Sequence, residues 1–302
     1  MFLKNLFNEV VIVKIIKKLV GCDDSVKYLL RMDDGNTVET LYMHDRELKL
    51  TYHSTVCVSS QVGCSQGCFF CATGKQGFVR NLTSYEIIEQ VGVCVDYCKQ
   101  AKLPTIDAVV FAGMGEPFMN YENVKEAIMK MYDKYKISNF EIATVGLAPK
   151  IHRLISDFKD SDINIRLNLS LHASSNETRK PIMPVTLKYD IKSIIDAAIE
   201  YAETFKIKTR IRYMIFKGIN DTDADVERLE KLLKGKPLKL IISAYNDNNI
   251  QGLIAPEQND VINFYNKLKD KIECEIFHNF GRDIKGGCGQ LRQEKMMEDK
   301  AI

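Results

Sequence analysis

Short apolar segments alternate with longer amphipathic segments along most of this 302-residue chain. From about Thr55 onward, each strand-like run is followed by a stretch in which apolar residues recur every three or four positions. Strands that alternate with helices form parallel sheets with right-handed crossovers. The chain holds about six such repeats, fewer than the eight of a closed barrel. We therefore predict an α/β fold, a partial barrel of the (β/α)6 type, with an open doubly wound sheet as the alternative.

Residue type supports the same division into elements. The strand candidates are short and rich in Val, Ile and Leu, whereas the helix candidates are longer and amphipathic. Thr83 and Glu86 form a capping-box pattern at the start of the first long helix. The predicted strands are 108–112, 141–145, 163–171, 209–216, 238–244 and 273–277, and the predicted helices include 84–99, 121–134, 191–205 and 223–233.

A hairpin signal precedes this alternating region. Residues 28–43 alternate apolar and polar side chains around the turn sequence Asp-Asp-Gly-Asn at 33–36. Together with residues 10–16, this segment predicts a small antiparallel piece. We assign residues 1–50 to an N-terminal β extension and residues 51–302 to the partial-barrel domain.

Composition limits the class of protein. Hydrophobic residues make up 45% of the chain and charged residues 27%, as in soluble globular domains. No apolar run reaches the roughly 18 to 20 residues that cross a bilayer, and residues 1–18 lack the pattern of a signal peptide. The net charge of +2 neither requires nor excludes a nucleic-acid partner. We expect a cytoplasmic protein.

Four of the nine cysteines fall between residues 57 and 71. Cys64, Cys68 and Cys71 have the spacing C-x3-C-x2-C, and three thiolates can anchor a 4Fe–4S cluster while one iron stays open. An open iron can bind S-adenosylmethionine, whose cleavage starts radical chemistry. A zinc site is the alternative, and it needs a fourth ligand such as Cys57 or a distant histidine.

Polar residues follow several of the predicted strands. Gly115 and Glu116 come after strand 108–112, Ser170 and His172 end strand 163–171, and Asn246 follows strand 238–244. The carboxyl ends of parallel strands are where such folds carry their chemistry. Glycine permits a ligand to approach the backbone closely, and a carboxylate can pair with an amino group. These residues are the candidates for cofactor binding.

The cysteine loop resembles the signature of the radical S-adenosylmethionine superfamily. Within that superfamily the chain resembles the RlmN/Cfr adenosine methyltransferases over roughly residues 36–292. Several long motifs in the right order carry this resemblance. They are CVSSQVGC at 57–64, CATGKQGF at 71–78, RNLT at 80–83, GMGEP at 113–117, SLH at 170–172, KGIND at 217–221 and CGQL at 288–291.

The resemblance implies an S-adenosylmethionine-dependent methyltransferase that acts on an adenosine of RNA. Members of the family modify a ring carbon of adenine that is too inert for ordinary displacement. They use two molecules of S-adenosylmethionine: the first methylates a cysteine, and the second yields the radical that removes hydrogen from the new methyl group. The resulting methylene radical adds to the adenine ring.

The runs Gly-Glu-Pro at 115–117 and Gly-Phe at 77–78 resemble RlmN more than Cfr. The expected activity is therefore C2 methylation of 23S rRNA, with transfer RNA as a further substrate. The alternatives are Cfr-like methylation at C8, the same chemistry on transfer RNA or another adenine-containing substrate, and a non-catalytic iron–sulfur or zinc binding module. Retention of both Cys57 and Cys288 argues against the binding module, which needs neither.

The resemblance also assigns roles to single residues. It matches Cys288 to the cysteine that carries the methyl group, and Cys57 to the cysteine that later attacks it and forms a transient disulfide. Glu39 matches the general base that removes the adenine proton. On the residues alone, the two cysteines could equally be structural and Glu39 a solvated residue of an alternating strand. The implied cofactor contacts are Gly115, Glu116, Ser170, His172 and Asn246, and the implied cluster ligands are Cys64, Cys68 and Cys71.

The sequence departs from the family pattern at several points. Ala143 stands where the family has the serine of a Ser-Thr-x-Gly turn, Asn246 is not followed by proline, and the stretch between Glu39 and Cys57 is longer. Family members also carry a helical RNA-binding domain before the hairpin, which we do not find here, so the choice between ribosomal and transfer RNA stays open. The expected partners are RNA and an electron donor such as flavodoxin or ferredoxin, with no membrane.

Overall fold

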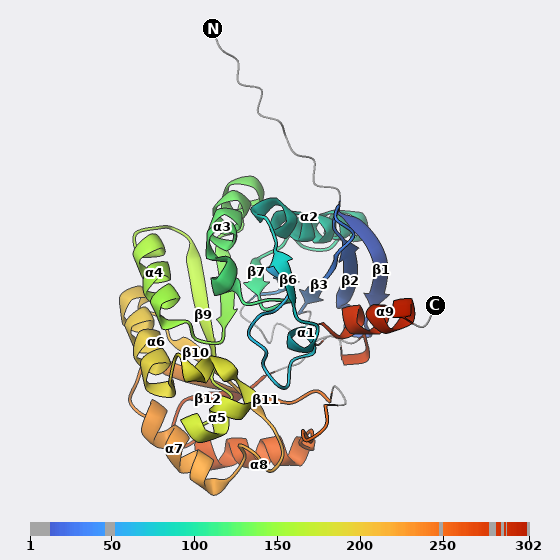
Figure 1. Cartoon of the computed structure of the whole chain (residues 1–302). Coiled ribbons are helices and arrows are strands. Elements are labelled where there is room, and N and C mark those ends of the chain that lie inside the picture. The colour runs from blue at the N-terminus through green and yellow to red at the C-terminus, as the bar shows by residue number, and fades with distance from the viewer. Residues whose placement is uncertain are drawn as a thin grey trace.

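The computed structural model describes residues 13–45, 52–247, 250–277, 282–284, 287 and 289–300, apart from the side chains of 282 and 298–300. Within these residues, one mixed sheet of ten strands forms the centre of the molecule, and helices cover its outer side (Figure 1). Along the sheet the strands follow the order β1 (Lys14–Val20), β2 (Val26–Arg31), β3 (Thr37–His44), β4 (Ser54–Val58), β7 (Ala108–Phe111), β8 (Asn139–Thr144), β9 (Asn164–Ser170), β10 (Thr209–Ile215), β11 (Leu238–Ala244) and β12 (Cys274–Ile276).

The direction of strand pairing changes at β4. Strands β1 to β4 pair antiparallel, whereas β4 and the strands from β7 to β12 pair parallel. Among the described strands, β1 and β12 stand at opposite ends of the order, so the sheet stays open. The predicted α/β class is confirmed, with a parallel core and an antiparallel N-terminal extension.

Helices connect the parallel strands and lie on the outer side of the sheet (Figure 1). At the start of the first long helix the Glu86 N–H donates to the Thr83 hydroxyl (3.2 Å), and the Thr83 N–H donates to the Glu86 carboxylate (2.8 Å). This reciprocal pair is the predicted capping box. The covering helices are α2 (Ser84–Ala101), α3 (Tyr121–Tyr135), α4 (Ala148–Phe158), α6 (Ile191–Phe205), α7 (Asp223–Leu233) and α8 (Gln258–Leu268).

The predicted boundaries agree well with the observed ones where the signals are local. Helices α6 and α7 have the predicted bounds, and the predicted parallel strands differ by at most two residues at either end. The strand predicted at 10–16 begins only at Lys14 and runs to Val20, and residues 10–12 lie outside the described residues. The structure adds α4, whose early proline is compatible with a first helical turn.

The N-terminal strands share a buried core with the rest of the sheet. Tyr28 of β2 and Tyr42 of β3 belong to the same hydrophobic cluster as Ile87 and Val91 of α2. Phe140 of β8 lies in this cluster too. Such a contiguous set of contacts is what defines one core. The antiparallel strands therefore extend the main sheet instead of packing on themselves.

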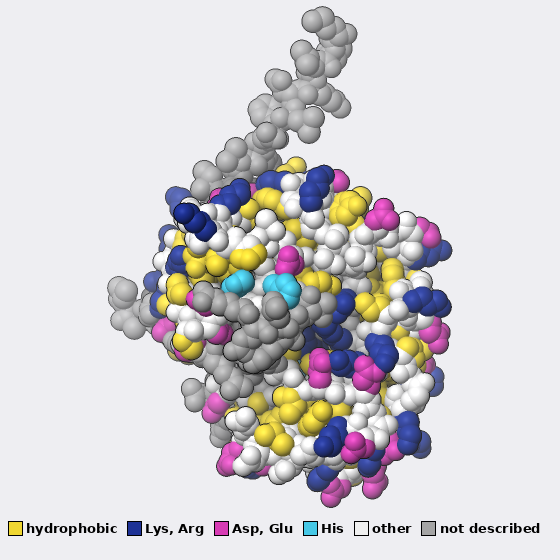
Figure 2. Space-filling view, turned by 180° about the vertical axis from the view of Figure 1, so that it is seen from behind, with side chains coloured by type: hydrophobic (Ala, Val, Ile, Leu, Met, Phe, Trp, Pro, Cys, Tyr) yellow, Lys and Arg dark blue, Asp and Glu magenta, His cyan; other side chains and the backbone are white. Residues whose placement is uncertain are grey.

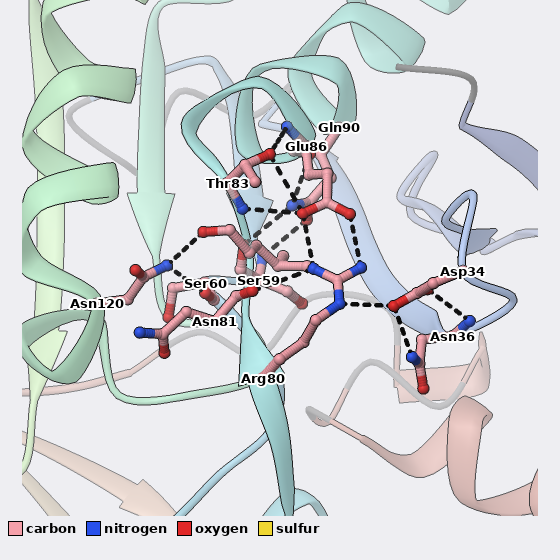
Figure 3. A network of polar contacts seen from close by, with 11 residues as sticks. Asp34, Asn36, Ser59, Ser60, Arg80, Asn81, Thr83, Glu86, Gln90 and Asn120 are labelled. Carbon is pink, nitrogen blue, oxygen red and sulfur yellow. Dashed lines mark hydrogen bonds and ion pairs between the residues drawn. The ribbon is translucent and has the colours of Figure 1, made fainter. Parts of the chain in front are cut away.

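Arg80 joins the hairpin turn to α2 through a network of polar contacts (Figure 3). Its Nε donates to Asp34 in the turn (2.6 Å), and its two Nη atoms donate to the Glu86 carboxylate at 2.8 and 2.7 Å. Gln90, one turn further along α2, accepts a hydrogen bond from the Ser59 N–H (2.8 Å). Bidentate pairs between guanidinium and carboxylate fix geometry as well as adding energy.

Charged side chains of both signs are interspersed on the face seen in Figure 2. This agrees with the net charge of +2. In the part of the chain that the structure describes, no helix is long and apolar enough to span a bilayer.

Candidate functional site

The three motif cysteines lie in the loop between β5 (Gln61–Gly63) and the short helix α1 (Ala72–Lys75). The Cys64 N–H donates to the Gly77 carbonyl (2.8 Å), which closes the loop at its base. Gly63 has a φ of +77°, and a Cβ there would lie 1.9 Å from the Gly77 oxygen. Only glycine fits this close approach, so the sequence Val-Gly-Cys before the loop has a steric cause.

The thiols of Cys64, Cys68 and Cys71 lie close enough to influence one another electrostatically. Burial raises the pKa of Cys64 to about 12, and the negative charges of Glu116 and Cys71 add to that rise. Burial also raises the pKa of Cys68 well above its usual range. Buried thiols become thiolates when a bound metal supplies positive charge. The donor set therefore fits an iron–sulfur cluster.

A compact single-ion site is not formed by these residues. Within the described ranges, no three His, Cys, Asp or Glu side chains converge closely enough to hold one metal ion. A tetrahedral zinc site needs such convergence, whereas a 4Fe–4S cluster binds each cysteine to a different iron. The eight described cysteines also form no disulfide with one another.

Apolar side chains pack the cysteine loop against the carboxyl ends of β9, β10 and β11. Cys68 lies in one buried cluster with Phe216, which follows β10, and with Tyr245, which follows β11. The Phe70 ring of the loop lies 5.2 Å from both the His172 and the Phe216 rings, measured between ring centres. The loop therefore sits where parallel sheets carry their chemistry.

Gly115 and Glu116 form a turn after β7 that faces the cysteine loop. Gly115 has a φ of +103°, and a Cβ there would lie 2.6 Å from the Cβ of Gln61. The Glu116 carboxylate is buried and accepts hydrogen bonds from the Val145 N–H (2.9 Å) and the Phe118 N–H (3.1 Å). Burial raises the pKa of Glu116 to about 7. The carboxylate is thus fixed between the ends of β7 and β8.

His172 follows β9 in the left-handed region, with a φ of +53°. Its Nδ1 accepts a hydrogen bond from the Met214 N–H (3.0 Å), which leaves the ring proton on Nε2. Burial, together with the charges of Arg179 and Arg212, lowers the pKa of His172 to about 3. The imidazole is neutral at physiological pH, and its ring packs against Phe70 of the cysteine loop.

The five predicted cofactor contacts differ in exposure. Glu116 and His172 are buried, Gly115 and Ser170 are half-buried, and Asn246 is exposed. The Ser170 carbonyl accepts a hydrogen bond from the buried Arg179 guanidinium (2.9 Å). The structure thus brings four of the five to the edge at which the cysteine loop packs, and it leaves Asn246 at the surface beyond β11.

A second group of predicted residues lies on the antiparallel part of the sheet. Strand register pairs Leu41 with Cys57, and Glu39 lies two residues before Leu41 on β3. Side chains two apart, and side chains directly opposite across strands, share one face. Glu39 and Cys57 are therefore on the same face. Glu39 is buried, so the alternative of a solvated carboxylate is wrong.

The segment before and within α9 (Gln290–Lys300) contacts this face. Cys288, the predicted methyl carrier, lies outside the described residues, but its chain neighbours Gly287 and Gly289 are described. The Gly289 N–H donates to Glu39 Oε2 (2.8 Å), and the Lys27 ammonium donates to the Gly287 carbonyl (2.7 Å). Figure 1 shows α9 in red beside the blue N-terminal strands.

Helix α1 connects the two groups. The Gln76 amide, just after α1, donates to the Gly289 carbonyl (2.8 Å), and the Arg292 guanidinium donates to the Gln76 amide oxygen (2.6 Å). Thr73 Oγ1 and Arg292 Nε are buried and have no hydrogen-bond partner within the described part of the chain. The sequence analysis missed Lys27, Thr73 and Gln76. Only Thr73 and Gln76 carried a signal, because they lie in the motif at 71–78.

Comparisons with known proteins agree with this geometry. A family described as the radical SAM superfamily matches residues 58–233. A "probable dual-specificity RNA methyltransferase RlmN" of Pseudothermotoga lettingae is 37% identical over 288 residues, which cover 94% of this chain and 80% of that protein. The "dual-specificity RNA methyltransferase RlmN" of a Nitratiruptor species is 37% identical over 296 residues, covering 93% and 81%.

A solved structure supports the same assignment. The crystal structure of a radical SAM methyltransferase from Sphaerobacter thermophilus superposes with a TM-score of 0.84 at 30% identity. The match covers 92% of this chain and 80% of that chain. The chain therefore belongs to the radical SAM superfamily and, within it, to the RlmN-type RNA methyltransferases.

Proposed function

We propose that this chain methylates C2 of an adenine in RNA, with Cys288 as the carrier of the methyl group. The observation that supports this most directly is the contact of Gly287 and Gly289, the neighbours of Cys288, with the sheet face that bears Glu39 and Cys57. A chain that only bound a cluster would need no such convergence of distant segments.

The relatives named above are dual-specificity RNA methyltransferases. We propose 23S rRNA and transfer RNA as the two substrates of this chain. The charged surface supports an RNA partner only weakly, because both signs are interspersed on the face in Figure 2. The protein would then select its substrate by the shape of the RNA and by its single-stranded loops, as is common for proteins that recognise RNA.

Cys64, Cys68 and Cys71 would hold the 4Fe–4S cluster, and the residues at the strand ends would hold S-adenosylmethionine. When bound, this pair supplies the methyl group and the radical chemistry that an inert ring carbon requires. Glu116 and His172 are proposed as fixed polar groups beside the cofactor, with Gly115, Ser170 and Asn246 as further contacts. A flavodoxin or ferredoxin is the proposed electron donor, and the cytoplasm the proposed location.

The remaining steps belong to side chains of this chain. The Cys288 thiolate accepts the methyl group. Once the methylene carbon has added to C2, Glu39 accepts the ring proton there, and one electron leaves with it, back to the cofactor pair that these residues would hold, so that the ring is aromatic again. Cys57 then attacks the Cys288 sulfur as a thiolate: the S–S bond forms as the S–C bond breaks. The departing carbon keeps the electron pair and takes up a proton, which leaves a methyl group on the ring.

We also propose that residues 1–50 are an extension of one catalytic domain formed by residues 51–302. The change from antiparallel to parallel pairing at β4 supports this division. The hydrophobic cluster shared by Tyr28, Tyr42 and α2 indicates that the two parts fold together.

The function is tested by mass spectrometry of nucleosides. Ribosomal and transfer RNA fragments are incubated with anaerobically reconstituted protein, reductant and S-adenosylmethionine. The Cys288→Ala variant should lose all methylation, because the methyl carrier is gone. The Cys57→Ala variant should accumulate a covalent RNA–protein adduct, because the adduct cannot be resolved.

Cys274→Ala is the matched control, because Cys274 begins β12, at the amino end of a parallel strand and at the other end of the strand order from β2 and β3. It should behave as the wild type. Methylation that survives in Cys288→Ala would contradict the proposal. A product methylated at C8 would favour the Cfr-like alternative.

A further inference from the structure

A lysine and a glutamate form a buried ion pair on adjacent strands of the N-terminal extension. Lys27 Nζ lies 2.8 Å from Glu39 Oε2, and the two side chains are only 2% and 4% exposed. Removing two charges from water is expensive, and such a pair is weak support for stability. In some proteins a buried ion pair or polar group is retained because it fixes one particular arrangement of the chain. We call this pair the Lys27–Glu39 clamp.

The Lys27–Glu39 clamp binds backbone groups of the two residues that flank residue 288. Lys27 Nζ donates to the Gly287 carbonyl at 2.7 Å, and the Gly289 N–H donates to Glu39 Oε2 at 2.8 Å. Gly287 and Gly289 are the chain neighbours of residue 288 on either side. Two charged side chains therefore restrain the backbone on each side of the cysteine.

Glu39 also caps the C-terminal helix. Its second oxygen, Oε1, accepts a hydrogen bond from the Arg292 N–H at 2.7 Å, within the first turn of α9. A carboxylate at a helix N-terminus satisfies free N–H groups and is favoured by the helix dipole. The direction in which α9 leaves the segment is thus set by the same carboxylate.

A third set of contacts comes from Gln76, just after the helix α1 that follows the cluster ligands. Gln76 donates to the Gly289 carbonyl at 2.8 Å and accepts from Arg292 Nη1 at 2.6 Å. Gly289 therefore has its N–H bound to the sheet and its carbonyl bound to the α1 region. This ties the segment around Gly289 to the end of the cysteine loop at Cys71.

We propose that Lys27 is a positioning residue for methyl transfer, acting with Glu39 to hold the segment Gly287–Gly289 in register with the cluster loop. This inference rests on the proposed role of Cys288 as methyl carrier. Lys27 itself touches neither cofactor nor RNA in this scheme. It acts through the two backbone groups and the carboxylate that it binds.

The test measures methylation of Cys288, which needs neither RNA nor proton abstraction by Glu39. Peptide mass spectrometry follows the methylated fraction with time in reconstituted holoenzyme. Lys27→Met should slow this step by about 100-fold, the effect expected of a misplacement near 1 Å. Lys27→Arg, which keeps the charge, should recover most of the rate. Iron content and cleavage of S-adenosylmethionine should stay at wild-type levels.

Lys17→Met is the matched control. Lys17 also joins an N-terminal strand to α9, through Glu294 at 3.5 Å, but this pair is more than one-third exposed on both sides. It should leave the rate unchanged. Hydrogen exchange should show loss of protection at the Gly289 and Arg292 amides in Lys27→Met alone, while the amides of β10 and β11 stay protected.

A buried charge left without its partner can prevent folding. The double variant Lys27→Met, Glu39→Gln removes both charges, so it leaves no unpaired charge in the core and should fold. It should still methylate Cys288 slowly. Wild-type rates in either variant would overturn the inference. The proposed function fails separately, if Cys288→Ala still methylates RNA. If Cys288→Ala loses RNA methylation but Lys27→Met methylates Cys288 at the wild-type rate, the proposed function stands and only the positioning role of Lys27 is contradicted.

Discussion

Glu116 shows how burial sets the chemistry of a single carboxyl group. It lies between the ends of β7 and β8, and no basic side chain is among the causes of its shift. Two backbone N–H groups and the Thr144 side chain favour its charged form, but loss of solvent outweighs them, and its pKa rises from 4.5 to about 7. The protein therefore holds a proton at this site through part of the neutral range.

This shift predicts how the stability of cluster-free protein depends on pH. The folded state binds the proton more tightly than the unfolded state, so the stabilisation is full below pH 4.5 and is lost as pH rises through about 7. Glu116→Gln removes the titration. Its free energy of unfolding, relative to wild type, should rise by about 2 to 3 kcal/mol between pH 4.5 and pH 8.

Urea unfolding at the two pH values measures the difference. The control is Glu203→Gln on the exposed side of α6, which should change by less than about 0.5 kcal/mol. A constant difference between Glu116→Gln and wild type at both pH values would show that the carboxyl group titrates normally.

At the scale of elements, the short ribbon of β5 and β6 (Phe78–Asn81) determines the shape of the cysteine loop. The two strands pair antiparallel, and the register shifts at Gly63. There the backbone of one strand approaches Gly77 so closely that no side chain fits. The segment that contains the cysteine loop and α1 therefore begins and ends at a contact between two glycines.

We expect Gly63→Ala to impair cluster assembly. The new Cβ would lie 1.9 Å from the Gly77 carbonyl oxygen, so the base of the loop must open. Iron content after anaerobic reconstitution should fall several-fold. Gly235→Ala is the control, because it has a similar φ of +72° but open space around its Cβ. Equal iron content in both variants would contradict the prediction, because the Gly63–Gly77 contact would then not be needed for cluster assembly.

Local signals made much of the fold predictable. The helices α6 and α7 were predicted with their bounds because period and capping residues lie within a few positions of one another. Four of the five strand-end residues were predicted to lie together because the ends of parallel strands meet at one edge, and the structure places them there. Their role as cofactor contacts stays a prediction. Lys27 could not be found this way. A lysine in a strand is usually solvated, and its burial depends on a partner 260 positions away.

At the scale of the whole molecule, the described residues of the N-terminal extension (13–45) share the core of the main sheet. Its tyrosines pack on α2, and the Arg80 network binds its turn to the same helix (Figure 3). Parts that share one core unfold together. The extension is therefore as much a part of the catalytic unit as the parallel strands.

We expect one unfolding transition for the chain. Circular dichroism and tyrosine fluorescence should give the same urea midpoint, because the extension and the parallel strands lose their shared core together. Arg80→Met should lower that midpoint without splitting it, at a cost of about 1 to 3 kcal/mol for the lost charged hydrogen bonds. Two separate transitions in either protein would contradict a shared core.

The Lys27–Glu39 clamp has a consequence for the order in which the protein is made. Chains emerge from the ribosome with the N-terminus first. The cysteine loop at 64–71 is therefore synthesised early, while Lys27 and Glu39 have their backbone partners only after Gly287 and Gly289 have been synthesised. The half of the enzyme that would generate radicals can thus form before the half that would use them. A nascent or C-terminally shortened chain would hold a cluster with no thiol to direct its chemistry.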